Sequence, residues 1–286
     1  MVRIKNTLGI DIGGSSIKAG FLPGPGARCL RFKAHPTPKT IQTIWELLID
    51  IIIDYCSRYQ VQAIGIGCPG PLDIKQGIII KTPNLPFKNF PLKQLLEKET
   101  HLPVMIDNDA NAFTLAEAVW GAGKKYKNVV GLTLGTGVGG GIVMDKKIYH
   151  GRGNAGELGY ILQNQNGPRG SLGECGSLQE YIRADTLTKN KKITVAGLAH
   201  EYGAQANKVW QDFGSHIGYT LASLSHILDP DVIILGGQIA KAWPRFYNSL
   251  QKSLNKNCIL PIPPIIKRSV LGDCAGVIGA TLLTVK

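Results

Sequence analysis

Two glycine loops, each directly after a short apolar run, constrain what this chain can fold into. The first loop is 11–16 (Asp-Ile-Gly-Gly-Ser-Ser), after the run 8–10, and the second is 135–140 (Gly-Thr-Gly-Val-Gly-Gly), after the run 129–134. Each is typical of a strand that enters a turn without bulky side chains, where backbone N–H groups are open to an anion. One such loop is weak evidence, but two predict a cleft that holds a nucleotide phosphate tail from both sides.

The second loop also satisfies the G-x-G-x-x-G pattern of dinucleotide-binding folds, but its surroundings do not. That pattern requires a helix directly after the loop and an acidic residue about 20 positions later. Here residues 141–144 (Gly-Ile-Val-Met) follow, which favour a strand, and the chain contains no G-x-x-x-x-G-K-[ST] P-loop. We therefore set aside a dinucleotide-binding domain of this type.

Strand-like and helix-like segments alternate along the chain, which predicts an α/β protein. With no long linker, we expect two α/β lobes with a cleft between them and a boundary near Asp107. Apolar spacing predicts helices over 40–59, 90–99, 110–120, 204–228, 239–254 with an interruption near Pro244, and 275–283. Strands are expected at 8–10, 17–21, 29–32, 63–66, 77–81, 104–106, 129–134, 141–144, 146–149, 232–235 and 265–270.

Composition excludes several classes of protein. Hydrophobic residues make up 44% and charged residues 18% of the 286, as in globular rather than disordered chains. No apolar run is long enough to cross a bilayer, and the first strand leaves no room for a signal-peptide apolar region. The six cysteines form no C-x-x-C pair, which favours reduced thiols. We expect a cytoplasmic protein with no membrane partner.

The net charge of +12 favours anionic partners, which are either nucleic acid or phosphorylated substrates. Basic residues are spread widely along the chain, without a long basic run or alternation with aromatic residues. A basic surface that attracts phosphorylated substrates therefore fits better than one that binds nucleic acid. We expect no nucleic-acid partner.

Asp11 stands at the end of the first strand, beside the glycines of the first loop. A carboxylate there can hold Mg²⁺, directly or through its water shell, next to a phosphate, while Ser15 offers a hydroxyl. The alternative is an ordinary β-turn, in which Asp and Gly are common.

Four polar residues, Asp107, Asn108, Asp109 and Asn111, lie where a strand meets a helix. One of them is explained as an N-cap, since Asn and Asp are preferred at that position. A cap does not explain all four together. A carboxylate here can act as a general base that accepts the proton of a sugar hydroxyl while the oxygen attacks a γ-phosphate.

Two further short segments offer polar groups for neighbouring sugar hydroxyls. The segment 156–159 (Gly-Glu-Leu-Gly) offers the carboxylate of Glu157, and the proline-flanked Asn84 offers an amide. Both groups suit bidentate recognition of hydroxyls. Taken singly, each is equally compatible with a simple turn.

Taken in order, these motifs resemble the ROK family (repressor, open reading frame, kinase) of the sugar kinase/actin/Hsp70 superfamily, over essentially the whole chain. The resemblance implies two ribonuclease-H-like, actin-like ATPase lobes that close over ATP and a sugar. The N-terminal small lobe is expected at 1–107, completed by a C-terminal helix at 274–286. The C-terminal large lobe is expected at 108–273.

The resemblance also implies roles for individual residues, with Asp109 as the catalytic base. Asp11 is the expected Mg²⁺ ligand. The nucleotide is expected at the first and second phosphate motifs and at the turn that holds the adenosine: Asp11, Gly13, Gly14, Ser15, Lys18, Gly135, Thr136, Gly137, Gly236 and Gly237. The sugar is expected at Gly70, Asn84, Asn108, Asp109, Glu157, Tyr160, Gln179 and Glu180.

The chain departs from the family at the zinc site. Many members place a His after G-E-x-G and then carry C-x-C-G-x-x-G-C-x-E, whose His and three Cys bind zinc. Here Tyr160 takes the His position, and Gly170, Leu172 and Ser177 take the Cys positions, so we expect no Zn²⁺. The pattern is most similar to the zinc-less ROK glucokinases of the cyanobacterial type.

The final Glu of that motif, which binds sugar in the family, falls on Gln179. Glu180 is its neighbour, and a one-residue shift would restore the carboxylate. Two readings of the whole chain follow: a sugar kinase with ATP and Mg²⁺, glucokinase-like, or a sugar-binding sensor without useful turnover. A third possibility changes the donor, since the basic surface would also admit polyphosphate.

Other partners are expected only by analogy with the family. A homodimer is one such expectation. Family repressors carry an N-terminal helix-turn-helix, for which the early first strand leaves no room.

Overall fold

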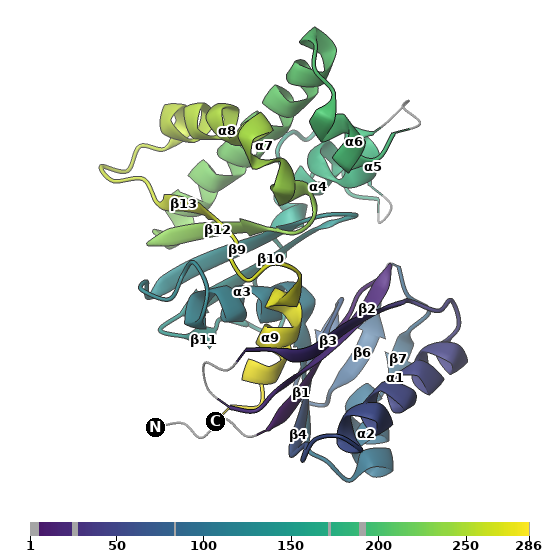
Figure 1. The fold of residues 1–286 in the computed structure, drawn as a ribbon. Helices are drawn as coiled ribbons and strands as arrows, with labels where there is room; N and C mark the ends of the chain where they lie inside the picture. The colour runs from purple at the N-terminus through teal and green to yellow at the C-terminus, as the bar shows by residue number, and fades with distance from the viewer. Residues whose placement is uncertain (1–5, 25–27, 83, 171–172, 189–192, 286) are drawn as a thin grey trace.

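Two five-stranded sheets with the same strand order form the framework of the computed structural model (Figure 1), which describes residues 6–24, 28–82, 84–170, 173–188 and 193–285. In each sheet the first three strands are antiparallel, and two later strands add in parallel beside the first. The first sheet has the order β3-β2-β1-β4-β8, with β1 Thr7–Ile12, β2 Ser16–Leu22, β3 Leu30–Pro36, β4 Ala63–Cys68 and β8 Val104–Asn108. The second has the order β11-β10-β9-β12-β13, with β9 Asn128–Leu134, β10 Val138–Met144, β11 Lys147–Ile148, β12 Val232–Gly236 and β13 Ile265–Arg268.

Each glycine loop joins the first two strands of its sheet. Ile12 pairs with Ile17 across the first hairpin, and Leu134 pairs with Val138 across the second. The predicted strand-turn-strand arrangement around both loops is therefore confirmed, and the same hairpin occurs once in each lobe.

Separate helices cover the outer face of each sheet. The first sheet packs against α1 (Ile41–Cys56) and α2 (Leu92–Thr100), and the second against α7 (Ala204–Leu228) and α8 (Trp243–Asn257). The structure gives α7 the predicted bounds, because its apolar residues recur at helical spacing and are buried: Trp210, Phe213, Ile217, Leu221 and Leu224.

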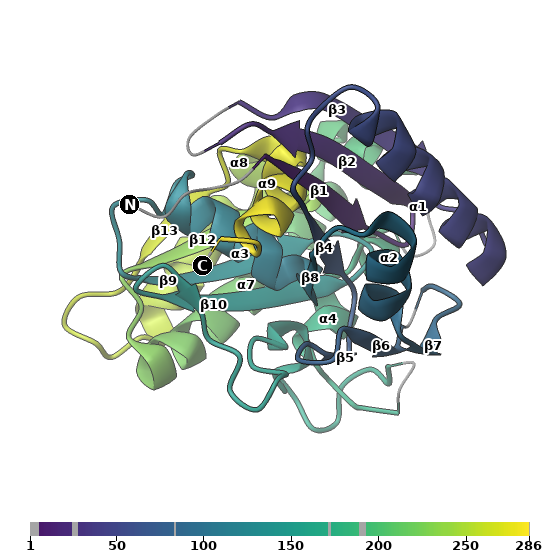
Figure 2. The same ribbon diagram turned by 90° about the horizontal axis from the view of Figure 1, so that it is seen from below.

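Two helices lie between the sheets, α3 (Asp109–Val119) and α9 (Ala275–Leu282), and they form a third apolar core (Figure 2). Glycines allow the close approach: a Cβ on Gly65 of β4 would lie 1.8 Å from the carbonyl oxygen of Ala280. A Cβ on Gly279 would lie 1.8 Å from the carbonyl oxygen of Ala112. The C-terminal helix thus packs on the first sheet, as the predicted small lobe requires, while the boundary at 107/108 stays a prediction.

The short elements were not predicted. They are the sheet of β5 (Leu72–Asp73), β6 (Ile78–Lys81) and β7 (Lys88–Phe90), the helices α4 (Leu178–Ile182), α5 (Ala184–Leu187) and α6 (Val195–His200), and the 3-10 turns η1 (Leu158–Tyr160), η2 (Ile239–Ala242) and η3 (Gly272–Cys274). Of this group, the strand at 77–81 was expected, and η2 lies within the segment 239–254 that was predicted to be helical. The remaining segments are two to six residues long and show no periodicity of their own.

One strand is shorter than predicted. β13 ends at Arg268 rather than Val270, because the chain turns towards the buried Glu117. Glu117 Oε1 accepts hydrogen bonds from Ser269 Oγ at 2.6 Å, Val270 N at 3.2 Å and Leu271 N at 3.0 Å. The backbone amides of Val270 and Leu271 thus bond to Glu117 and do not extend the strand.

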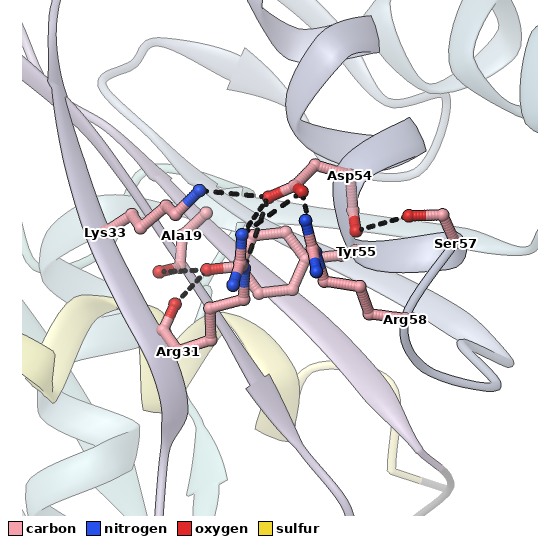
Figure 3. A network of polar contacts seen from close by, with 7 residues as sticks. All are labelled: Ala19, Arg31, Lys33, Asp54, Tyr55, Ser57 and Arg58. Carbon is pink, nitrogen blue, oxygen red and sulfur yellow. Dashed lines mark hydrogen bonds and ion pairs between the residues drawn. The ribbon is translucent and has the colours of Figure 1, made fainter.

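A polar network joins β3 to the end of α1 (Figure 3). Asp54 pairs with Arg31 at 3.1 Å, Lys33 at 3.1 Å and Arg58 at 2.9 Å. Tyr55 Oη donates to the carbonyl oxygens of Ala19 and Arg31. Hydrogen bonds from the three cations hold the pKa of Asp54 well below its usual range. The network is structural and lies away from the candidate site.

Candidate active site

The predicted motifs converge because they follow parallel strands. The carboxyl ends of neighbouring parallel strands meet at one edge of a sheet, where ligands bind in open α/β folds. In the first sheet, β1, β4 and β8 lead to Gly13, Gly70 and Asp109; in the second, β9 and β12 lead to Gly135 and Gly237. The predicted phosphate, sugar and base motifs therefore occupy the corresponding edges of the two sheets.

The first glycine loop is a tight turn that leaves its tip open. Gly13 N donates to Ser16 O at 3.0 Å, while Gly14 and Ser15 are exposed. Thr37 braces the turn by donating its hydroxyl to Gly13 O at 2.6 Å. A Cβ on Gly14 would lie 3.0 Å from Cβ of Asn84, so the structure brings the predicted sugar residue Asn84 beside the first phosphate loop.

Asp11 precedes this loop and pairs across the hairpin with Lys18, whose Nζ lies 3.8 Å from Oδ2. Its side chain is 17% exposed, and burial raises its pKa while Lys18 opposes the rise. A Cβ on Gly276, at the start of α9, would lie 2.5 Å from Asp11 Oδ2. The carboxylate is thus held between β2 and α9, close to the phosphate loop.

The second glycine loop is held by groups distant in sequence. Gly135 N donates to Gly137 O at 3.0 Å, and Ala184 N donates to Gly135 O at 3.0 Å. Gly237 has φ +86°, and a Cβ there would lie 2.3 Å from Leu134 O. The Gly236–Gly237 turn therefore packs directly on the strand end that carries the second phosphate loop, which only glycine permits.

Asn108 is the N-cap of α3, and Asp109 is its first residue. Asn108 Oδ1 accepts hydrogen bonds from Ala110 N at 2.8 Å and Asn111 N at 3.2 Å. The capping interpretation thus explains Asn108 but leaves Asp109 available. Burial, and then the negative charge of Asp11 and of Glu157, raises the pKa of Asp109 to about 7. A carboxyl group with that pKa exchanges protons near neutral pH.

Beside Asp109 lies a pocket built from both lobes. It includes three of the predicted sugar residues, Gly70, Asn108 and Glu157, and burial raises the pKa of Glu157. The residues that line it are Gly70, Pro71, Leu72, Ile74, Asn108, Asn111, Gly140, Gly153, Asn154, Ala155, Gly156 and Glu157.

The other predicted sugar residues lie outside this lining. Gln179 Oε1 accepts a hydrogen bond from Val138 N at 3.1 Å, so its amide braces the second glycine loop. Tyr160 hydrogen-bonds Gln179, and burial together with Glu157 raises the pKa of its phenol. Glu180 is 3% exposed, its carboxylate lies 3.3 Å from Arg183, and it is not among the residues that line the pocket.

The positions of the family's zinc ligands carry other residues. Tyr160, Gly170 and Ser177 are described, and Leu172 lies outside the described residues. Over the part of the chain that the structure describes, no three His, Cys, Asp or Glu side chains gather as a metal site would require. The prediction that zinc does not bind here stays a prediction. Within the same residues, no helix has the length and apolar character needed to cross a bilayer.

Two residues of the site region were missed from sequence, Thr37 and His150. Thr37 braces the first phosphate loop, and His150 Nε2 lies 2.6 Å from Asp107 Oδ2. Neither residue belongs to one of the motifs that directly follow a predicted strand. His150 is 43 positions from its partner, so no local pattern could have paired them.

Comparisons with known proteins agree with this geometry. The profile of the ROK family matches residues 7–286. A glucokinase of Halalkalibacterium halodurans is 32% identical over 95% of this chain and 92% of its own length. A xylose repressor of Bacillus spizizenii is 30% identical over 87% of this chain and 68% of its own length.

Among solved structures, the crystal structure of a ROK family glucokinase from Streptomyces griseus in complex with glucose and AMPPNP superimposes with a TM-score of 0.87. It is 28% identical, and the match covers 98% of this chain and 99% of that one. The predicted fold class, two actin-like ATPase lobes, is thereby confirmed.

Proposed function

Because this chain belongs to the ROK family and is a sugar kinase, we propose that it transfers the γ-phosphoryl group of ATP to a hydroxyl of a hexose, with glucose as the first candidate. The observation that carries the proposal is Asp109. Its carboxyl group lies at the start of α3 beside a pocket shared by both lobes, and its pKa is raised to about 7.

Asp109 is the proposed general base. A bound sugar hydroxyl would donate its proton to the Asp109 carboxylate as the hydroxyl oxygen attacks the γ-phosphorus, and the bond to the β-phosphate oxygen breaks. A base with a pKa near the working pH combines a useful fraction of the ionised form with sufficient basicity. Exclusion of water between the lobes would prevent hydrolysis of ATP in place of transfer.

The two glycine loops are proposed to bind the phosphates, through Gly13, Gly14 and Ser15 on one side and Gly135 to Gly137 on the other. Lys18 adds a positive charge beside them, and Gly236 and Gly237 are proposed for the adenosine. The loops are held open by Thr37, Gln179 and Ala184, so their N–H groups are preorganised for an anion.

Asp11 is proposed to hold Mg²⁺, directly or through water. Its fit to a cation rests on a mostly buried carboxylate whose ion pair with Lys18 is a long 3.8 Å. When bound, Mg²⁺ would neutralise charge on the phosphate oxygens of ATP. The negative charge of Asp11 also contributes to the raised pKa of Asp109.

Hydroxyl recognition is proposed for Gly70, Asn84, Asn108 and Glu157, with Tyr160 at the edge. Gln179 acts in this proposal through the second phosphate loop that it braces. Glu180, which faces Arg183, is the least suited of the predicted residues to reach a sugar.

The alternative of a sugar-binding sensor is motivated by the xylose repressor similarity and by Gln179 at a sugar-binding glutamate position. Both proposals are tested with a panel of donors (ATP, GTP and polyphosphate) against a panel of sugars (glucose, mannose and fructose). The release of ADP or of sugar phosphate is measured. Transfer from ATP that Asp109→Asn abolishes, with glucose binding retained by calorimetry, supports the kinase. The exposed Asp145→Asn is the matched control.

Glucose binding without transfer from any donor would favour the sensor. Transfer from polyphosphate but not ATP would correct the donor. Near-normal turnover of Asp109→Asn would refute the assignment of the base.

A further inference from the structure

Asp107, next to the end of β8, has an almost fully buried carboxylate beside the sugar pocket. Its Oδ1 accepts hydrogen bonds from Asn108 N at 2.7 Å and from Asn111 Nδ2 at 3.0 Å. Its Oδ2 lies 2.6 Å from His150 Nε2, and the side chain is 5% exposed. A buried carboxylate is costly unless donors satisfy it, so this group must keep its partners in place.

His150 reaches Asp107 from the other lobe. It follows β11, the edge strand of the second sheet, whereas Asp107 belongs to the first sheet. The hydrogen bond that the imidazole donates to Asp107 raises the pKa of His150, which favours its charged form. The contact is therefore a short, charge-assisted link between the two lobes at the pocket.

The backbone of His150 carries one wall of the pocket. Its carbonyl oxygen accepts hydrogen bonds from Gly153 N at 2.7 Å and Ala155 N at 3.1 Å. The turn fixed in this way supplies residues 153–157 of the lining, including Glu157. The opposite wall contains Asn108 and Asn111, which Asp107 holds. One carboxylate thus fastens both walls.

Asn111 has an atom that this network leaves open. Its residue is 3% exposed and lines the pocket, and its Nδ2 is committed to Asp107. Its Oδ1 is buried and has no hydrogen-bond partner among the residues that the structure describes. An orphaned buried acceptor at the wall of a pocket calls for a donor from a bound molecule, and a sugar hydroxyl is such a donor.

We propose that Asp107 and His150 form a clasp between the lobes that positions the sugar pocket, and that Asn111 Oδ1 accepts a hydrogen bond from a sugar hydroxyl. This inference rests on the proposed hexose kinase activity and deepens it. Asp107 and His150 are positioning residues: they touch the pocket walls and not the reacting atoms. Asn111 is a sugar-binding residue.

The clasp is tested with paired variants of each partner, one that keeps a hydrogen-bonding group and one that does not. His150→Gln keeps an N–H donor toward Asp107, whereas His150→Ala removes it. Asp107→Asn keeps Oδ1 for its two donors, whereas Asp107→Ala removes it. The exposed His200→Gln is the control. KM for glucose, KM for ATP, kcat, the melting temperature and calorimetric glucose affinity are measured for each.

In the Ala variants, KM for glucose and the glucose dissociation constant are expected to rise about tenfold or more, equivalent to about 1.4 kcal/mol. KM for ATP and kcat stay within about threefold, because hydrogen-bond loss at the pocket wall leaves Asp109 and the glycine loops intact. The Gln and Asn variants recover most of the affinity. A merely structural role would lower the melting temperature and affect both substrates alike, and that result would overturn the clasp.

Asn111 is tested with Asn111→Ala and Asn111→Leu, both of which remove Oδ1. A loss of glucose affinity in both, with KM for ATP unchanged, supports the hydrogen bond to the sugar, and unchanged glucose affinity overturns it. Failure of the kinase proposal is separate: wild-type protein would then bind glucose in the calorimeter without transferring phosphate, and the same variants would still report on the pocket. Absence of both binding and transfer for every hexose of the panel would overturn the kinase proposal and the clasp together.

Discussion

Replacing Asp109 by asparagine is expected to remove activity and to stabilise the protein at neutral pH. The wild-type pKa of about 7, against an ordinary value of 3.8, means that the folded protein holds this proton more tightly than the unfolded chain. Between those two pH values the unfolded state is ionised and the native state is not, so stability falls as pH rises. Above about pH 7 the full penalty of an ionised, partly buried carboxylate is present.

The difference between the two pKa values is worth about 4 kcal/mol at about 1.4 kcal/mol per pH unit. Because the Asp109 side chain is only half-buried, solvent screening reduces this figure to about 2 kcal/mol. Asparagine carries no charge and keeps an acceptor for Ala110 N, whose bond to Asp109 Oδ1 is 2.9 Å. The variant should therefore melt roughly 4 °C higher than wild type at pH 8.

The gain should be absent at pH 3.5, grow between pH 4 and 7 and level off above, as measured by scanning calorimetry at several pH values. In parallel, wild-type kcat/KM for glucose should fall about tenfold for each pH unit below about 7, because only ionised Asp109 accepts the proton. Equal melting temperatures at all pH values, or a rate that stays flat down to pH 5.5, would refute the raised pKa. Asp145→Asn, on an exposed turn, controls for loss of a charge.

Three other substitutions probe separate parts of the structure. Glu117→Ala removes the buried carboxylate that accepts from Ser269 Oγ, Val270 N and Leu271 N and should cost about 3 kcal/mol of unfolding free energy; urea denaturation checks this against the exposed Glu46→Ala, expected within about 0.5 kcal/mol of wild type. Gln179→Leu removes the acceptor of Val138 N and should raise KM for ATP more than KM for glucose, whereas the reverse split in steady-state kinetics would return Gln179 to the sugar. Gly279→Ala forces a Cβ to within 1.8 Å of a backbone oxygen of α3 and should lower stability by about 1–3 kcal/mol, measured by thermal melting; an unchanged melting point would contradict the tight α3–α9 contact.

Much of the fold could be predicted from the sequence, because apolar residues recur at regular spacing in the long helices and strands. α7 has the predicted bounds, and both hairpins were predicted from a glycine loop between two apolar runs. The short elements α4 to α6 and β5 and β7 were missed, since their two- to six-residue segments show no apolar periodicity of their own. Their conformation is set by what they pack on, which is a property of the tertiary structure.

The candidate site was predictable where its residues follow strand ends. Asp11, Asn108 and Asp109 were found because motif and strand adjoin in the chain. The hydrogen bonds that support the site could not be predicted in this way. Gln179 and Val138 are 41 positions apart, and His150 and Asp107 are 43 positions apart. The environment of Glu180 was equally hidden, because sequence alone does not show that its carboxylate is buried and paired with Arg183.

The placement of α9 bears on the order in which the molecule can be completed during synthesis. β1 and β4 leave the ribosome early, yet Gly9 and Gly65 of these strands lie against the backbone of α9, whose first residue is 275. The nascent first sheet therefore keeps one apolar face without its native cover while roughly two hundred further residues are translated, which takes about 10–40 s at about 5–20 residues per second. A chain halted before α9 would expose that face to chaperones, and nascent-chain proteolysis should show the first lobe gaining resistance only after the second.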